Sequence, residues 1–177
     1  MATLEAIPGK LDGVLLVKPK IFADSRGSFT ETFHAVKYRD LGIEKEFVQD
    51  NVSVSKQHVL RGLHFQRRYP QGKLVFCVVG EIYDVAVDIR PDSATFGQWE
   101  AHRLSAENYH QLFIPAGFAH GFLVLSETAT VTYKCTDIYR PDDDAGIRWD
   151  DPALAIEWPV TTPILSDKDQ QLPLLDS

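Results

Sequence analysis

Apolar and polar residues alternate along several short segments of the chain, and Gly, Pro and Asp residues separate these segments. Because successive side chains of a β-strand point to opposite faces, this alternation predicts short strands joined by turns. The clearest example is Phe47–Ser55, in which Gln49, Asn51, Ser53 and Ser55 fall on one face. Amides and hydroxyls line that face, so the segment predicts one wall of a polar cavity.

The pattern predicts little helix, since only residues 36–44 form a helical candidate and that segment is brief. Further strands are predicted at residues 13–19, 28–33, 74–80, 81–90, 96–104, 108–114, 123–125 and 129–139. Many short strands between turns indicate an all-β sandwich or barrel. The chain contains no internal repeat, low-complexity tract or linker, so we expect one domain spanning residues 1–177.

Composition narrows the possible partners of the protein. The chain has 177 residues, a net charge of −7 and 24% charged residues, which is typical of one soluble domain and argues against non-specific nucleic-acid binding. No apolar run approaches the ~20 residues that span a bilayer, and Met1–Lys10 has no signal-peptide core. Cys77 and Cys135 each lie inside a predicted strand, so we expect reduced thiols in a cytoplasmic protein, although one disulfide between them remains open.

Candidate chemistry begins at Leu60–Val75, where Arg61, His64 and Lys73 lie within a short span of chain. A nearby positive charge disfavours protonation of an imidazole, so His64 is expected to stay neutral and able to accept a proton. The two cations are suited to phosphates or to a developing oxyanion. Most single His residues do no chemistry, so a structural His64 fits this segment equally well.

A second histidine ends the segment Pro115-Ala-Gly-Phe-Ala-His120, which has the form of the second cupin motif. In that motif a turn presents the His into a small β-barrel. A cupin metal centre also needs a His-x-His pair and a following carboxylate. The chain has no second His beside His64 and no Glu after it, so we expect no bound metal. A metal-free barrel that contains both histidines and the two cations favours base chemistry on an anionic ligand.

Proton donors and orienting carboxylates can also be proposed from residue type. Tyr133 and Tyr139 are able to supply phenol hydroxyls, and the candidates to orient the first histidine are Asp84, Asp88 and Asp169. A carboxylate bonded to one ring nitrogen fixes the tautomer and stabilises the imidazolium. Each of these residues also has an ordinary structural explanation, as a core aromatic or as a solvated carboxylate.

Several short motifs follow one another along the chain. They are Phe47-Val-Gln-Asp-Asn51, Leu60-Arg-Gly-Leu-His-Phe-Gln66, Gln71-Gly-Lys-Leu-Val75, Asp84-Val-Ala-Val-Asp-Ile-Arg90, Phe96-Gly-Gln-Trp99, Leu104-Ser-Ala-Glu-Asn108, Pro115-Ala-Gly-Phe-Ala-His-Gly-Phe122, Tyr133-Lys134 and Leu165-Ser-Asp-Lys-Asp169. In this order they resemble the dTDP-4-dehydrorhamnose 3,5-epimerase family, the third enzyme of dTDP-L-rhamnose synthesis. The resemblance covers nearly the whole chain.

The resemblance implies a cupin-type jelly-roll fold with short peripheral helices, and a homodimer whose subunits share strands. It implies that His64 is the general base and Asp169 its partner. It also implies that Tyr133 is the general acid and that Lys73 steadies the enolate oxygen. The positions that match nucleotide-sugar contacts are Arg26, Glu31, Gln49, Asp50, Asn51, Arg61, Lys73, His120 and Lys168. Asp144 also matches a ligand-contacting position, although the two preceding Asp residues leave that alignment ambiguous.

The implied reaction converts dTDP-4-keto-6-deoxy-D-glucose into dTDP-4-keto-L-rhamnose by inverting C3 and C5, with no cofactor and no metal. The alternatives are a C3-only or C5-only epimerase of another deoxysugar pathway, a metal-dependent cupin oxygenase or isomerase, and a non-catalytic sugar-binding cupin. Neither a nucleic acid nor a membrane is an expected partner. Arg67-Arg68-Tyr69-Pro70 and Cys77 are local variations that we expect beside the site, where they could alter substrate preference.

Overall fold

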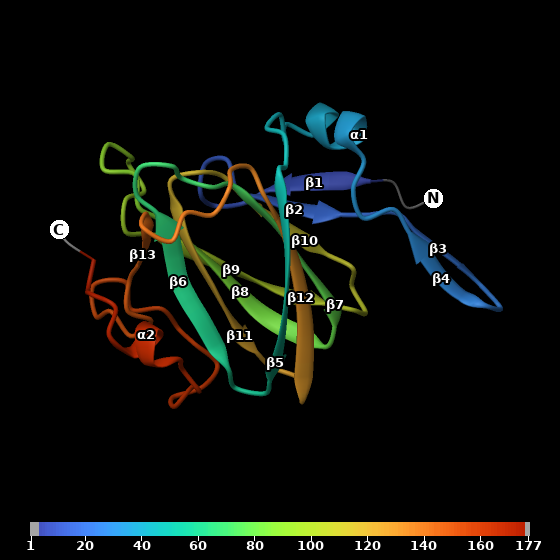
Figure 1. Cartoon of the computed structure of the whole chain (residues 1–177). Helices are drawn as coiled ribbons and strands as arrows, with labels where there is room; N and C mark the ends of the chain where they lie inside the picture. Colours follow the sequence, from blue (N-terminus) through green and yellow to red (C-terminus); the bar gives the residue numbers. More distant parts are fainter. Residues whose placement is uncertain (1–3, 176–177) are drawn as a thin grey trace.

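The computed structural model describes residues 4–175 and consists mainly of two antiparallel β-sheets packed face to face (Figure 1). The first sheet contains, in spatial order, β1 (Glu5–Pro8), β2 (Leu15–Lys18), β10 (Gln111–Ile114), β7 (Lys73–Val79), β12 (Thr128–Cys135) and β5 (Gln49–Lys56). The second contains β13 (Asp144–Gly146), β6 (Leu60–Gln66), β11 (Phe118–Val124), β8 (Glu81–Asp88) and β9 (Trp99–Ser105). This jelly-roll sandwich confirms the predicted all-β fold.

Four smaller elements lie outside the two sheets. Strands β3 (Ile21–Asp24) and β4 (Gly27–Thr30) form a hairpin that projects away from the sandwich (Figure 1). The helices are α1 (Ala35–Asp40) and α2 (Asp167–Gln170). Neither of these described helices has the length and apolar character needed to cross a membrane.

Strand β8 shows how the residue pattern divides the interior into layers. Ile82 and Ala86 point into the core between the two sheets, whereas Val85 and Val87 point to the opposite face. That opposite face is covered by the C-terminal segment, including Leu154. Full burial of such an apolar side chain stabilises the fold by about 1.5–3 kcal/mol. Strand β8 therefore has buried apolar side chains on both of its faces, and the C-terminal segment packs against the second of them.

Helix α1 packs on the outer face of the first sheet and is shorter than residue pattern predicts. Its Tyr38 is buried, and the phenol hydroxyl donates to Oε1 of Gln111 at 2.7 Å. The predicted helix extended to residue 44, but Leu41 ends the helix and Gly42 adopts a φ of +95°. Glycine reaches this left-handed region at little cost, which favours helix termination there.

Most predicted strands are present, but their observed bounds differ from the predicted ones, most clearly in β12, β4 and β11. Strand β12 stops at Cys135 rather than at residue 139, because Cys135 is paired with Gln49 and Lys73, the first residues of the neighbouring strands. Strand β4 stops at Thr30 because its only partner, β3, begins at the paired residue. Strand β11 begins at Phe118 rather than at residue 123, so the turn that follows Pro115 is shorter than predicted.

Strands β6 and β11 approach each other unusually closely beside a register shift. The shift lies between His120 and Phe122, where Gly121 faces Gly62 of the neighbouring strand. A Cβ atom at position 121 would lie 2.7 Å from the carbonyl oxygen of Arg61. The absence of a side chain at this point therefore allows the two strands to pair, and their pairing sets His64 directly opposite His120.

We expect Gly121→Ala to lower the free energy of unfolding by about 1–3 kcal/mol, because the methyl group overlaps main-chain atoms that cannot move independently. Urea unfolding followed by Trp fluorescence measures this change. Gly27→Ala is the control, since Gly27 has a φ of +130° but no heavy atom within 4 Å of the added methyl. A larger loss at Gly27 than at Gly121 would show that backbone strain, rather than close packing, dominates.

Candidate active site

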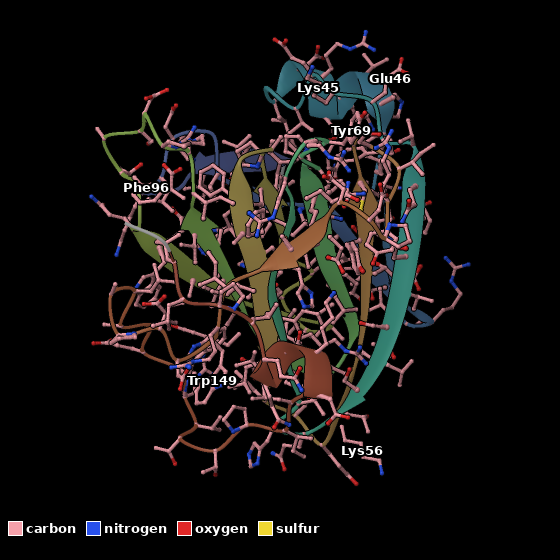
Figure 2. All side chains as sticks on the ribbon, turned by 60° about the vertical axis from the view of Figure 1, so that its left-hand side comes forward. Lys45, Glu46, Lys56, Tyr69, Phe96 and Trp149 are labelled. Carbon is pink, nitrogen blue, oxygen red and sulfur yellow. The ribbon has the colours of Figure 1, made fainter. Side chains whose placement is uncertain are left out.

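A cavity of about 570 Å³ lies between the two sheets at one side of the sandwich. On that side the edge strand β5 of the first sheet faces β6 and the edge strand β13 of the second. Figure 2 shows this side of the molecule, with β5 running down to Lys56. The cavity residues that sequence reasoning singled out are Gln49, Asn51, Ser53, Arg61, His64, Lys73, His120, Tyr133, Tyr139, Asp144, Lys168 and Asp169. Residues more than a hundred positions apart thus meet in one concave space, and the polar face predicted for β5 forms one of its walls.

His64 and Asp169 form a direct pair in this cavity. His64 extends from β6, and its Nε2 lies 2.6 Å from Oδ1 of Asp169 on α2. In a neutral ring, Nε2–H donates to the carboxylate and leaves the Nδ1 lone pair free to accept a proton. Burial opposes ionisation of Asp169, but hydrogen bonds from His64 and Ser166 outweigh it and hold the pKa of this carboxyl below its usual value.

His120 has a different carboxylate partner. Its Nε2 lies 2.7 Å from Oδ1 of Asp84, and both side chains are buried. Burial lowers the pKa of His120, against the opposing effect of Asp84. Asp88 instead accepts hydrogen bonds from Arg90 and Ser93 in a loop. Of the three carboxylates proposed to orient His64, Asp169 is therefore the one that contacts it. The proposals for Asp84 and Asp88 are wrong, because these carboxylates bind other side chains.

Lys73 and Tyr133 complete the group of titratable side chains. Burial lowers the pKa of the Lys73 ammonium, although Cys135 and Asp84 oppose this effect. Burial raises the pKa of the Tyr133 phenol, with Arg61 acting in the opposite direction. Neither the ammonium nor the phenol oxygen has a hydrogen-bond partner within residues 4–175. The ammonium can therefore donate to a ligand oxygen, and the phenol stays protonated at neutral pH.

Asp144 stands out among the three consecutive Asp residues. It lines the cavity, and its Oδ2 accepts hydrogen bonds from Lys168 and from the Tyr139 hydroxyl. Asp143 is buried away from the cavity and accepts a hydrogen bond from the main-chain N–H of Arg68. Asp142 is exposed. Position 144 is therefore the one of the three that could reach a bound ligand.

Three predicted ligand contacts lie outside the cavity of this chain. Arg26 is at the tip of the projecting hairpin, where it pairs with Asp24. Glu31 follows the hairpin and pairs with Lys37 at 2.7 Å. Asp50 points to the outer face of β5. Their placement is compatible with ligand contact only if another molecule brings them to a cavity.

The comparisons with known proteins agree with this geometry. A family model described as dTDP-4-dehydrorhamnose 3,5-epimerase matches residues 8–177 of the chain. The chain belongs to this family. The epimerase of Methanothermobacter thermautotrophicus is 52% identical over 173 residues, which cover 96% of this chain and 94% of that protein. The predicted family and its isomerase class are therefore confirmed.

Solved structures and more distant relatives extend the comparison. The dTDP-6-deoxy-D-glucose-3,5-epimerase of Legionella pneumophila, solved in complex with dTDP-4-keto-L-rhamnose, has a TM-score of 0.95 and 50% identity, covering 98% of this chain and 93% of that one. A dTDP-4-dehydrorhamnose 3-epimerase from Streptomyces niveus is 39% identical over 170 residues, covering 95% of this chain and 82% of its own length. Family members thus include enzymes named for inversion at one carbon.

Sequence reasoning gave no role to several cavity residues of this epimerase-family chain, among them Cys135 and Ser166. Cys135 lies two positions after Tyr133 on β12, so strand alternation was a signal for it. Ser166 caps α2 by accepting a hydrogen bond from the main-chain N–H of Asp169, and a Ser before a helix is the usual signal for a cap. Both cysteines are free and buried, and Cys77 lies in the core between the sheets rather than at the cavity.

The loop at residues 67–70 adjoins the cavity without lining it. Arg68 is bound by Asp143, and the Arg140 guanidinium lies 4.0 Å from the centre of the Tyr69 ring. Arg67 lies over the ring of Phe65, which does line the cavity. Across the described part of the chain, no cluster of three or more His, Cys, Asp or Glu residues is arranged to hold a metal ion.

Proposed function

We propose that this protein is a dTDP-4-dehydrorhamnose 3,5-epimerase, which inverts C3 and C5 of dTDP-4-keto-6-deoxy-D-glucose to give dTDP-4-keto-L-rhamnose. The observation that carries the proposal is the convergence of the His64–Asp169 pair, Lys73 and Tyr133 on one cavity. These groups supply a base, an oxyanion partner and an acid. Family membership supports the same reaction.

The substrate determines what the side chains must do. C3 and C5 are both adjacent to the C4 ketone, so removal of either proton gives an enolate with its charge on O4. His64 takes the proton, and Asp169 holds the ring and stabilises the imidazolium that forms. The Lys73 ammonium, which lacks another partner in the described structure, stabilises O4. Comparable oxyanion donors contribute about 3–4 kcal/mol to the transition state.

Inversion requires a proton from the opposite face of the sugar. Tyr133 extends from β12 in the first sheet, whereas His64 extends from β6 in the second, so the two residues approach the cavity from different sheets. The raised pKa of Tyr133 keeps its phenol protonated and able to donate. After His64 removes a proton from one face, Tyr133 returns one to the other, and the carbon inverts.

The remaining cavity cations suit the charged part of the ligand. Arg61 has no carboxylate partner in the described structure, and Lys168 is held at the cavity by Asp144. Both are placed to bind phosphate oxygens, with Gln49 and Asn51 offering amides along β5. We further propose that the chain acts as a single domain and that its free thiols reflect the reducing cytoplasm.

The active form is proposed to be a homodimer. Phe29 of the projecting hairpin is 68% exposed, and Val54 on the outer face of β5 is 67% exposed. Exposed apolar groups of this size are typical of a surface that a partner covers. A second copy of the chain would cover them, and its hairpin would bring Arg26 and Glu31 to this cavity. The separation of these residues from their own cavity supports such an exchange.

The reaction is tested by incubating the protein with dTDP-4-keto-6-deoxy-D-glucose in D₂O after exhaustive chelation, with NMR of the product. We expect deuterium and inversion at both C3 and C5, because the groups described act without a metal. His64→Asn should abolish exchange and inversion while leaving dTDP binding intact, since only the basic nitrogen is lost. Exchange at C3 alone would favour the C3-specific alternative, and exchange in His64→Asn would mean that another residue is the base.

Tyr133→Phe tests the division of labour between acid and base. The enolate should still form, so deuterium should enter the sugar with retained configuration, while inverted product falls by about 10²–10⁴-fold. NMR of the product in D₂O measures both quantities. Tyr139→Phe is the control, because that hydroxyl already donates to Asp144. If Tyr139→Phe gives exchange without inversion and Tyr133→Phe does not, the acid has been assigned to the wrong tyrosine.

Mixed subunits test whether Arg26 acts across a dimer. Arg26→Ala and His64→Asn are each expected to have little activity as separate preparations. In a mixed dimer, the Arg26→Ala subunit retains His64 and receives an intact Arg26 from its partner, so unfolding and refolding the two variants together should restore activity toward one quarter of wild type. Failure of the mixture to regain activity, with dimers verified by sedimentation, would place Arg26 at its own cavity or at neither.

A further inference from the structure

We propose that Ser55 is a positioning residue that holds the Arg61 guanidinium in its cavity-facing pose. The inference rests on the proposed function, in which Arg61 binds an anionic oxygen of the nucleotide sugar. Ser55 acts through Arg61 and needs no contact with the ligand itself.

The contact between the two residues joins the exposed Arg61 side chain to a buried hydroxyl. Ser55 is 7% exposed and lies on the inner face of β5 near its end. A short turn joins β5 to β6, which carries Arg61. Nε of Arg61 donates to Oγ of Ser55 at 2.9 Å, and Nη2 lies 3.5 Å from the carbonyl oxygen of Val54. A hydrogen bond from a charged donor to a shielded acceptor is stronger than an average protein hydrogen bond.

These contacts use one edge of the guanidinium. Nε and Nη2 form the side edge of the group, and both are directed at β5. The end edge, made by Nη1 and the second proton of Nη2, has no protein acceptor within residues 4–175. An arginine presents two parallel N–H groups along such an edge, which matches two oxygens of a phosphate. Fixing the side edge on the strand therefore leaves the end edge available for the ligand.

The neighbouring serine shows that this arrangement is not a general property of the β5 wall. Ser53 lies two residues away on the same face, yet its hydroxyl oxygen is buried with no hydrogen-bond partner in the described structure. Ser55 alone of the two meets a side chain from β6. A long arginine side chain loses much conformational freedom when a ligand orders it, and a preformed contact reduces that loss.

A double-mutant cycle on Ser55 and Arg61 tests the assignment. We expect Ser55→Ala to lower kcat/KM for dTDP-4-keto-6-deoxy-D-glucose by about 10-fold, mainly through KM, because a charged hydrogen bond is lost while Val54 still contacts the guanidinium. Ser55→Thr keeps the hydroxyl and should recover most of the loss. In an Arg61→Gln background, Ser55→Ala should have no further effect. Ser55→Cys, which is nearly the same size, provides a second variant if Ser55→Ala folds poorly.

The control separates positioning from a general loss of stability. Ser126 accepts from the Glu81 main-chain N–H at 2.8 Å and lies outside the cavity, so Ser126→Ala should lower the thermal midpoint without raising KM. An equal fall in kcat/KM caused by Ser55→Ala with and without Arg61, or no fall at all, would overturn the positioning role. If Arg61→Gln itself leaves kcat/KM unchanged, then the ligand-binding role of Arg61 in the proposed function is wrong.

Discussion

The register between β6 and β11 is the constraint on which the site depends. Because strand side chains alternate, a slip of one residue would send His64 to the apolar layer and Leu63 into the cavity. The side-chain-free contact between Gly62 and Gly121 fixes this register at one point, where each glycine meets main-chain atoms of the other strand. Main-chain packing thus decides which side chains of β6 face the cavity, and it thereby places the His64 imidazole there.

The residue pattern was sufficient to predict the layers of the fold, but it was not sufficient to predict which side chains contact each other in the site. Alternation predicted a polar wall at β5 and a strand at β8, since the direction of each side chain along a strand depends only on its position in the sequence. It could not assign the carboxylate of His64, because Asp169 lies 105 residues away and Asp84 is equally suitable in type. Strand ends were misjudged for a related reason, as β12 ends where its paired strands begin. The roles of individual site residues came from family resemblance.

Electrostatics in the cavity run against the charge of the whole chain. The protein carries a net charge of −7, yet Arg61, Lys73 and Lys168 all face the same space. The carboxylates nearby are themselves engaged, Asp169 by His64 and Asp144 by Lys168. Since buried charges interact more strongly than solvated ones, this local arrangement, rather than the net charge, governs attraction of an anionic ligand.

The position of α2 has a consequence for how the enzyme comes into being. Every strand of both sheets precedes residue 147, whereas the carboxylate that pairs with His64 arrives at residue 169. Translation therefore supplies the residues of every strand before it supplies the carboxylate that contacts His64. A chain that stops before α2 would contain every strand, Arg61 and Lys73, but it would lack both the Lys168 ammonium and the carboxylate that contacts His64. In translation order, the site is therefore completed later than the two sheets that position the rest of its residues.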